Sequence, residues 1–278
     1  MGKPKNIFRI LQLSDVHAGI LDFHLGYCLD KRFFGRLNQA TMRHRRLALD
    51  RLPKFALLQR ESEADFTLCT GDLTSLGSSE EFRHCIGLLD EIRQNAGGNF
   101  AFVPGNHDAY VAKNSKALED AFKVLNNQQL ELNCLPAALC VGPVEFVLIN
   151  PARPCAIWLS TGELTGDAWQ KLDYILSKPL PPGIKARVVV SHFPVCDHEG
   201  RALSWRTKLV GYEKLLEWAS RKRFGALLTG HVHKPFVHHI GGSGPLAVGA
   251  GSITICRSCA QIDVNTATGE ISAQTITL

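Results

Sequence analysis

Five short polar segments, each placed shortly after an apolar run, constrain this chain more than any other feature. The segments are Asp15-Val16-His17, Gly71-Asp72, Gly105-Asn106-His107-Asp108, Ser191-His192 and Gly230-His231-Val232-His233. The runs that precede them have the length and composition of strands and are Phe8–Leu13, Phe66–Cys69, Phe100–Val103, Arg187–Val190 and Ala226–Leu228. In open α/β sheets, ligand sites form where the carboxyl ends of strands meet their loops. The pattern therefore predicts that the five segments meet at one site.

The side chains in these segments point to a metal centre. They offer carboxylate, imidazole and amide groups and no thiolate, a donor set that suits divalent Mn, Fe, Zn, Co or Ni rather than a closed structural zinc site. The Asp-x-His and His-x-His spacings would put both side chains of each pair on one side if the backbone is extended. One such segment alone is more often a turn or a cap, but all five in this order predict a metal site.

Strand-like and helix-like runs alternate along the rest of the chain, which predicts a layered α/β architecture. Apolar residues at helical spacing follow Ser78, which forms a capping box with Glu81. Helices are expected from there to Ile92, after Gly166, from Tyr212 to Arg221, and from Pro53 to Arg60. Further strands are expected at Glu145–Ile149, Phe236–Ile240, Leu246–Val248, Ala260–Val264 and Ile271–Ile276. No linker divides the chain, so residues 1–278 are interpreted as a single domain.

The stretch from Asp22 to Arg51 is distinguished by its charge. Seven Lys or Arg residues lie between Lys31 and Arg51 against one acid, Asp50, in a chain whose net charge is only +5. This local excess indicates a phosphate-bearing partner or an anionic membrane surface. We expect a basic, helical insertion at about 22–51 that acts as a lid, a membrane contact or a structural cover.

Composition indicates an ordinary globular protein, with 45% hydrophobic and 21% charged residues. No apolar run is long enough to span a bilayer, and the first residues lack the apolar core of a signal peptide. The nine cysteines are scattered and odd in number, as expected for reduced thiols. A cytoplasmic location is therefore expected, with the basic insertion as the segment that would touch the inner face of the membrane.

The order of the five segments resembles that of the calcineurin-like metallophosphoesterase superfamily, over residues 15 to 233. The resemblance implies an α/β fold: a four-layer αββα sandwich, with two mixed β-sheets flanked by helices and the site at one end. It also implies two divalent metal ions, for which Mn²⁺ is the expected species. One ion would be held by Asp15, His17, Asp72 and His233, and the other by Asp72, Asn106, His192 and His231. Every ligand position of the superfamily is present.

The resemblance also assigns catalytic roles. His107 would be the general acid that protonates the leaving oxygen, and Asp108 would orient it. The two ions would bind the phosphoryl oxygens and lower the pKa of the attacking water. The chain is therefore expected to be an enzyme that hydrolyses a phosphoester or pyrophosphate bond.

The substrate is less constrained than the reaction. The stretch Lys31–Asn38 reads KRFFGRLN, and together with Gly71-Asp72-Leu73-Thr74 and Glu80-Glu81-Phe82 it looks similar to one bacterial branch of the superfamily. That branch hydrolyses the pyrophosphate of UDP-2,3-diacylglucosamine in lipid A synthesis. A cyclic-nucleotide phosphodiesterase has the same metal segments and stays open as an alternative. A non-catalytic metal-binding scaffold is the alternative of another class. Nucleic acid is the least favoured partner, because no aromatic stacking platform is evident.

Four residues are candidates for substrate contact. Arg153 follows a predicted strand and Asn150, from where it could reach a phosphate. Lys31 and Arg32 lie in the basic insertion and could bind the charged part of the substrate. Trp205 is a candidate for an apolar wall of the pocket.

Overall fold

The structure is a computed structural model of the chain and describes residues 3–18, 48–156 and 158–278. Most of the predicted basic insertion, including Lys31 and Arg32, lies outside the described residues, as does the helix expected there. Among the residues that are described, no helix has both the length and the apolar character needed to cross a bilayer.

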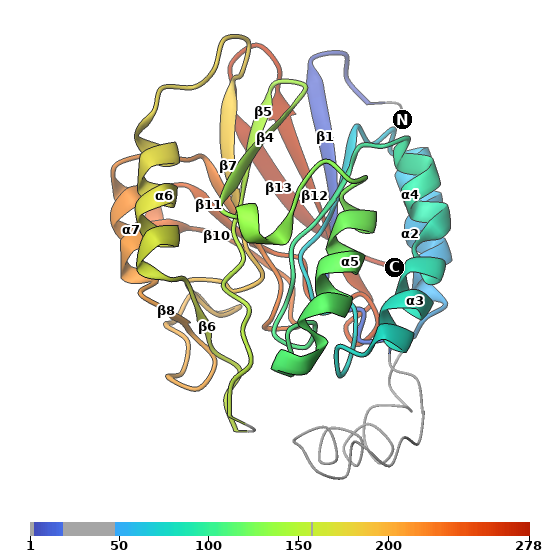
Figure 1. Ribbon diagram of the computed structural model, residues 1–278. Helices are drawn as coiled ribbons and strands as arrows, with labels where there is room; N and C mark the ends of the chain where they lie inside the picture. Colours follow the sequence, from blue (N-terminus) through green and yellow to red (C-terminus); the bar gives the residue numbers. More distant parts are fainter. Residues whose placement is uncertain (1–2, 19–47, 157) are drawn as a thin grey trace.

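Two mixed β-sheets form the centre of the molecule (Figure 1). The first has the strand order β13-β12-β1-β2-β3, and the second has the order β10-β11-β9-β7-β5-β4. The first sheet contains β1 (Ile7–Leu13), β2 (Phe66–Cys69), β3 (Phe100–Phe102), β12 (Ser258–Asn265) and β13 (Ile271–Thr277). The second contains β4 (Ala137–Val141), β5 (Val144–Leu148), β7 (Ala186–Val190), β9 (Ala226–Thr229), β10 (Phe236–His239) and β11 (Leu246–Gly249). A separate short ladder pairs β6 (Gly162–Glu163) with β8 (Leu209–Val210).

Helices cover the outer face of each sheet, at the right and left of Figure 1. The first sheet is covered by α2 (Arg51–Glu61), α3 (Ser79–Leu88), α4 (Asp90–Ala96) and α5 (Ser115–Leu125), and the second by α6 (Gly166–Ser177) and α7 (Glu213–Ser220). Short 3-10 turns lie at Ala112–Asn114, Leu132–Cys134 and Ile240–Gly242. Buried apolar residues form one layer between the sheets and one under each set of helices. The predicted four-layer αββα sandwich is confirmed.

The central strands could be recognised in the sequence because they are buried on both faces. In β5, Phe146 and Leu148 contribute to the layer between the sheets, whereas Val147 contributes to the layer under α6 and α7. Successive strand residues point to opposite faces, so a strand covered on both sides reads as a continuous apolar run. Phe146 also stacks on Phe66 of the facing sheet, with ring centroids 4.5 Å apart, which joins the two sheets.

The helix expectations were mostly met, with two differences. The capping box is present, since the Ser78 hydroxyl accepts from the Glu81 amide at 3.1 Å and the Glu81 carboxylate accepts from the Ser78 amide at 3.2 Å. However, α3 ends at Leu88, and a separate helix, α4, continues to Ala96. Neither α5 nor the edge strand β4 was predicted, although the buried residues Leu118, Ala121, Phe122 and Leu125 of α5 have helical spacing.

The parallel strands bring the five polar segments to one end of the molecule. β1, β2 and β3 are parallel in the first sheet, and β7 and β9 are parallel in the second. The Asp15 amide donates to the Gly71 carbonyl at 2.9 Å, and the Gly230 amide donates to the His192 carbonyl at 3.0 Å. The His231 amide donates to the Asp15 carboxylate at 3.1 Å, which connects the loops of the two sheets.

A buried ion pair lies at the other end of the second sheet. Arg187, at the start of β7, contacts the Glu145 carboxylate, and the two side chains are only 5% and 7% exposed. The Arg187 guanidinium also donates to the carbonyls of Leu176 at 3.2 Å and Lys178 at 2.9 Å. These bonds satisfy carbonyls at the end of α6 and attach the helix to the sheet.

We predict that Glu145→Gln lowers the free energy of unfolding by about 3–5 kcal/mol, because it leaves the Arg187 cation buried without a counter-charge. Denaturant unfolding monitored by circular dichroism measures this change. Glu217→Gln is the matched control, since Glu217 pairs with Arg221 on the surface and the two side chains are 54% and 58% exposed. The control should change stability by less than about 1 kcal/mol. Equal effects of the two substitutions would contradict the structural role of the buried pair.

Candidate metal centre

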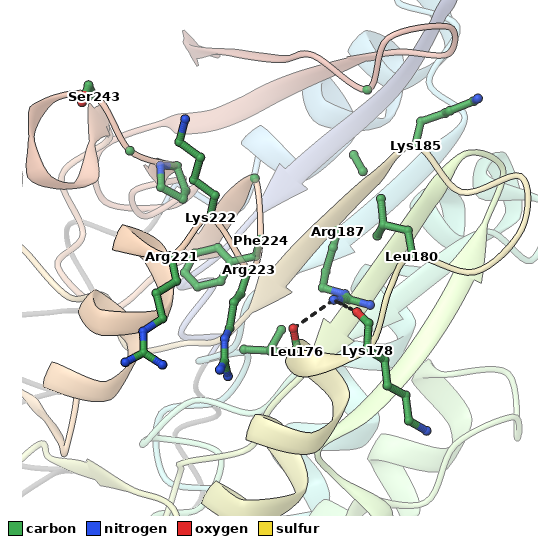
Figure 2. A pocket seen from close by; sticks show the side chains of 15 residues that line it. Leu176, Lys178, Leu180, Lys185, Arg187, Arg221, Lys222, Arg223, Phe224 and Ser243 are labelled. Carbon is green, nitrogen blue, oxygen red and sulfur yellow. Dashed lines mark hydrogen bonds between the residues drawn. The ribbon is translucent and has the colours of Figure 1, made fainter.

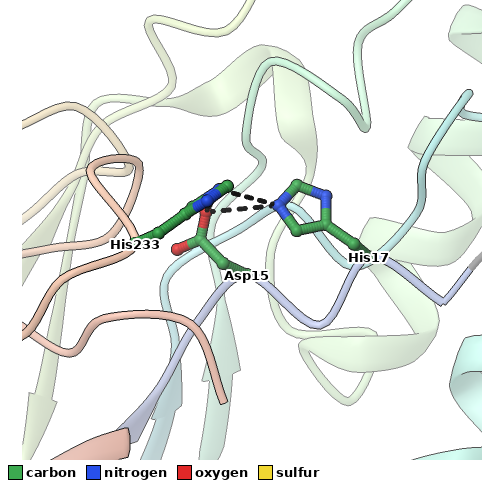
Figure 3. Close-up of side chains that lie close together, drawn as sticks. All are labelled: Asp15, His17 and His233. Atoms are coloured by element: carbon green, nitrogen blue, oxygen red, sulfur yellow. Dashed lines mark hydrogen bonds and ion pairs between the residues drawn. The ribbon is translucent and has the colours of Figure 1, made fainter. Parts of the chain in front are cut away.

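Three side chains from distant parts of the chain point toward a common centre (Figure 3). The Nε2 atoms of His17 and His233 are 3.0 Å apart. The Asp15 Oδ1 atom lies 3.3 Å from His233 Nε2 and 3.6 Å from His17 Nε2. The Asp15 Oδ1 atom is buried and accepts no hydrogen bond within the described residues. Donor atoms gathered in this way, with an unsatisfied carboxylate oxygen among them, fit a cation.

Asp72 lies between this group and a second one. Its Oδ2 atom is 3.8 Å from His17 Nε2 and 3.4 Å from His192 Nε2. The second group continues from His192 Nε2 to the Asn106 Oδ1 atom at 3.2 Å, and from there to His231 Nδ1 at 3.0 Å. The structure thus brings together all seven residues that the sequence singled out as metal ligands, with one carboxylate next to both groups.

Main-chain carbonyls orient two of the imidazoles. His192 Nδ1 lies 2.7 Å from the Thr70 carbonyl oxygen, and His231 Nε2 lies 2.8 Å from that of Thr207. Because a carbonyl only accepts, these ring nitrogens carry the hydrogens. The opposite nitrogens then face the other members of the second group. Carbonyls in this position are typical of metal-binding histidines, so the residues fit a metal pair.

The backbone of these segments differs from the extended conformation that we expected. Asp15, His17, Asp72, His231 and His233 have φ values of 54°, 49°, 53°, 72° and 60°. Left-handed conformations are costly for residues other than glycine and persist where surrounding contacts enforce them. The motif spacing therefore brings the side chains together through left-handed turns instead of strand alternation.

Two hydroxyl residues that the sequence did not reveal support this backbone. The Ser252 hydroxyl donates to the Asp15 carbonyl at 2.7 Å, and the Thr254 hydroxyl donates to the Val16 carbonyl at 3.0 Å. The Ser252 amide also donates to the His233 carbonyl at 2.7 Å. Both residues are fully buried. The segment after β11 thus holds the first and the last polar segments in place.

Glycine is required where two of these loops approach each other. A Cβ atom at Gly105 would lie 2.1 Å from Asp72 Oδ1 and 2.5 Å from the Asp72 amide nitrogen. Gly71 has a φ of 95°, and a Cβ there would lie 2.6 Å from the Gly105 amide nitrogen. Contacts this short are repulsive. A side chain at Gly71 or Gly105 would therefore push the Gly-Asp and Gly-Asn-His-Asp segments apart.

The charges of the centre favour cations. Burial opposes ionisation of Asp72, but His192 and His107 hold its pKa below the ordinary value. Burial also opposes a charge on His192, yet the Asp72 carboxylate outweighs it and raises the His192 pKa to about 9. For His231, burial and the neighbouring His192 lower the pKa to about 4. An ionised, buried carboxylate thus lies among imidazoles and stabilises positive charge.

His107 lies beside the centre and is held by a main-chain group. Its Nδ1 atom donates to the Ser75 carbonyl at 2.8 Å, and its amide donates to Asp72 Oδ1 at 2.7 Å. The ring lies edge-on to His17, with centroids 4.9 Å apart, and stacks on Tyr110 at 5.6 Å. The orientation of His107 therefore comes from Ser75 and from the surrounding rings.

Asp108 is held by main-chain amides of two neighbouring loops. Its carboxylate accepts hydrogen bonds from the amides of Thr74 and Gly105, both at 3.0 Å, and from that of Leu73 at 3.3 Å. Burial, followed by the charge of Asp72, raises the pKa of Asp108 to about 6. The Asp108 carboxylate thus joins the two loops, and the Ser75 carbonyl contacts the His107 ring, so the role of Asp108 in orienting His107 stays a prediction.

A pocket of about 260 Å³ opens at the centre and is lined by Asp72, Asn106, His107, Ser160, Leu203, Thr207, His231, Val232 and His233. Trp158 and Trp205 flank the segments that supply Ser160 and Leu203, and they are 66% and 64% exposed. Trp205, expected in the pocket wall, is instead next to the lining, and the Arg206 guanidinium lies 5.1 Å from its ring centroid. Arg153 forms an ion pair with Glu163 and is 45% exposed.

We predict that Gly105→Ala lowers the free energy of unfolding by at least about 2 kcal/mol, because the new methyl group overlaps Asp72. Gly87→Ala is the matched control, since Gly87 lies in α3 and a Cβ there meets nothing within 4 Å. The control should stabilise the chain by about 0.5–1 kcal/mol. Thermal unfolding of both variants measures the changes, and a harmless Gly105→Ala would refute the close approach.

Comparison with known proteins agrees with this geometry. The sequence model of the calcineurin-like phosphoesterase family matches residues 8–235. No curated protein matches the chain in sequence. Among solved structures, a dimetal phosphatase from Danio rerio has a TM-score of 0.60 at 16% identity, with 97% of this chain and 98% of that chain covered.

Two other solved structures have a fold similar to that of this chain. A 5′-nucleotidase precursor from Thermus thermophilus has a TM-score of 0.54 at 16% identity, covering 98% of this chain and 54% of its own. The purple acid phosphatase PPD1 from yellow lupin has a TM-score of 0.56 at 11% identity, covering 98% and 54%. The chain thus spans about half the length of these two proteins. Because the family model covers most of the chain and the site described above, the chain belongs to the calcineurin-like phosphoesterase family, a family of metal-dependent hydrolases of phosphoesters.

Proposed function

We propose that the chain hydrolyses a phosphoester or diphosphate bond in a substrate that carries a nucleotide. The reaction rests on one observation, the position of Asp72 between two groups of metal-type donors at the floor of a pocket that His107 also lines. One cation would be held by Asp15, His17, Asp72 and His233, and the other by Asp72, Asn106, His192 and His231. When bound, divalent cations supply Lewis acidity that lowers the pKa of water and offsets charge on the phosphoryl oxygens.

The residues of the chain supply the remaining requirements of the reaction. Carbonyls of Thr70 and Thr207 fix the two imidazoles, so the donor set is preorganised. His107 presents its ring to the pocket while Nδ1 donates to Ser75. A proton on its Nε2 atom can then pass to the leaving oxygen as the bond to phosphorus breaks, which releases a neutral alcohol or a protonated phosphate.

The nucleotide is supported by the two exposed tryptophans near the pocket. Trp158 and Trp205 belong to the segments around the β6–β8 ladder, which also contribute Ser160 and Thr207 to the pocket lining. Large exposed aromatic rings are typical of binding surfaces, and stacking of a base on such a ring contributes about 1–3 kcal/mol. The pocket, at about 260 Å³, is suited to the phosphate and its sugar, with the base on the rim.

Two nucleotide substrates are candidates. UDP-2,3-diacylglucosamine is favoured by the KRFFGRLN stretch, whose basic and apolar residues would contact the acyl chains and the inner face of the membrane from the cytoplasm. Cyclic AMP is the second candidate, favoured by the small volume of the pocket. Mn²⁺ is the cation that we propose for either reaction.

The substrate is tested with purified protein and added Mn²⁺, by measuring hydrolysis of bis-p-nitrophenyl phosphate, cyclic AMP and UDP-2,3-diacylglucosamine side by side. We expect one of the two nucleotides to be hydrolysed with a higher kcat/KM than the other nucleotide and than bis-p-nitrophenyl phosphate. Preference for the lipid nucleotide supports the lipid A role, and preference for cyclic AMP supports a role in nucleotide signalling. Preference for the aryl diester over both nucleotides would count against a nucleotide substrate.

Removal of the Trp158 or Trp205 ring tests whether these side chains bind the base at the edge of the pocket. Trp158→Ala and Trp205→Ala should each raise KM for the preferred nucleotide about fivefold or more, with kcat little changed, because stacking affects binding and not the chemical step. Trp205→Phe should retain most of the affinity. Tyr174→Ala is the matched control, since Tyr174 is 61% exposed on α6. If the tryptophan variants behave like this control, the rim does not bind the base.

Replacement of the acid tests His107. His107→Ala should slow hydrolysis of a diester with an alkyl leaving group about 10²–10⁴-fold, because such a group needs a proton to depart. A p-nitrophenyl leaving group is stable as an anion and should be much less affected. Metal content, measured by elemental analysis, should stay at the level of the unaltered chain. An equal loss for both leaving groups would argue against the acid role.

A further inference from the structure

A second and larger pocket lies at the opposite end of the second sheet (Figure 2). Its volume is about 550 Å³, and its walls come from the end of α6, the start of β7, the turn after α7 and the segment before β11. These are the amino ends of the strands whose carboxyl ends lead to His192 and His231. Since β7 has five residues and a strand rises about 3.3 Å per residue, roughly 15 Å of strand separates this pocket from the candidate metal centre.

The lining of this pocket is strongly basic. Its charged members are Lys178, Lys185, Arg187, Arg221, Lys222 and Arg223, and it contains no Asp or Glu. Figure 2 shows them distributed around the pocket, on the α6–β7 side and on the α7–β9 side. Apolar lining residues such as Leu180 and Phe224 lie between them. Like charges crowded around one hollow repel each other, so the arrangement favours an anion that joins them.

Half of these cations already have acidic partners outside the pocket. Arg187 is neutralised by Glu145 and bonded to carbonyls of the α6 end, as described above. Arg223 pairs with Asp173, and Arg221 pairs with Glu217 on the surface. In the described part of the chain, no ion pair involves Lys178, Lys185 or Lys222. The Lys178 ammonium lies 3.9 Å from the centroid of the Tyr174 ring, which leaves Lys185 and Lys222 as the lining lysines with neither an acidic nor an aromatic partner among the described residues.

We propose that this pocket binds a compact polyphosphate, in the form of an inorganic tri- or polyphosphate or of a nucleoside triphosphate. A ligand with three or more negative charges matches a lining of six cations, three of which have no acidic partner among the described residues, whereas a monovalent carboxylate would offset only one. The volume of about 550 Å³ lies within the usual range of ligand pockets. The pocket is open to solvent, so that a small anion can enter it, and it lacks the exposed aromatic rings with which proteins bind single-stranded nucleic acid.

The test measures binding of inorganic triphosphate, ATP, orthophosphate and phosphatidylserine vesicles by isothermal titration calorimetry, with no metal added to the purified full-length chain. Four proteins are compared: the unaltered chain, Lys178→Gln/Lys222→Gln, the control Lys116→Gln/Lys123→Gln on α5, and Asp72→Ala. The two lysine pairs remove the same net charge, and Asp72→Ala disables the candidate metal centre. A cooperative unfolding transition without ligand shows that each protein is folded, and the shift of its midpoint with triphosphate provides a second measure of binding.

We expect triphosphate to bind the unaltered chain, the α5 control and Asp72→Ala with similar affinity, and Lys178→Gln/Lys222→Gln at least tenfold more weakly. Equal affinities for triphosphate and ATP would indicate recognition of the phosphates alone, and tighter binding of ATP would indicate a nucleotide ligand. Equal loss in both lysine variants would overturn the proposal, as would loss in Asp72→Ala alone. Orthophosphate binding as tightly as triphosphate would also overturn it, and so would binding confined to phosphatidylserine vesicles.

Discussion

The site depends on the burial of one carboxylate. Asp72 is only 1% exposed, and a buried charge is costly unless it is compensated. Compensation comes from the His107 amide at 2.7 Å and from imidazoles of both sheets, while Gly105 leaves room for the carboxylate. These groups come from loops after β1, β3 and β7, and Asp72 itself follows β2. The two sheets must therefore be packed face to face before the Asp72 charge can be accommodated, which links the stability of the sandwich to the chemistry of its edge.

The sequence was sufficient to predict the donors but not how they are held. Residues such as Asp72 and His192 could be found because polar groups directly after buried apolar runs are conspicuous. The left-handed backbone at Asp15 and His17 could not, since nothing in an Asp-x-His spacing distinguishes a strand from a sharp turn. The supports from Ser75, Thr70 and Thr207 use main-chain carbonyls, which any residue possesses. The hydrogen bonds that the Asp108 carboxylate accepts could not be predicted for the same reason, because they come from backbone amides.

The proposed substrate contacts are harder to predict from the sequence than the metal ligands, because they lie on loops. The reacting end is built from strand termini, whose positions follow from the sheet. Trp158 and Trp205 lie on segments without long regular structure, and only the structure shows that both are exposed near the pocket. The same strands lead to the basic pocket at their other ends, where Arg187 is bound by Glu145 and the lysines are not. One rigid sheet thus presents two chemically different ends.

The candidate metal centre is tested most directly by counting the cations that each chain binds. Elemental analysis after dialysis against Mn²⁺ should find two ions in each chain of the unaltered protein. Asp72→Ala should lose at least one of them and all activity toward bis-p-nitrophenyl phosphate while remaining folded, because both groups of donors share this carboxylate. Asp167→Ala, which removes an acid from the first turn of α6, should keep both ions. Two ions retained by Asp72→Ala, or a single ion in the unaltered chain, would contradict the proposed centre.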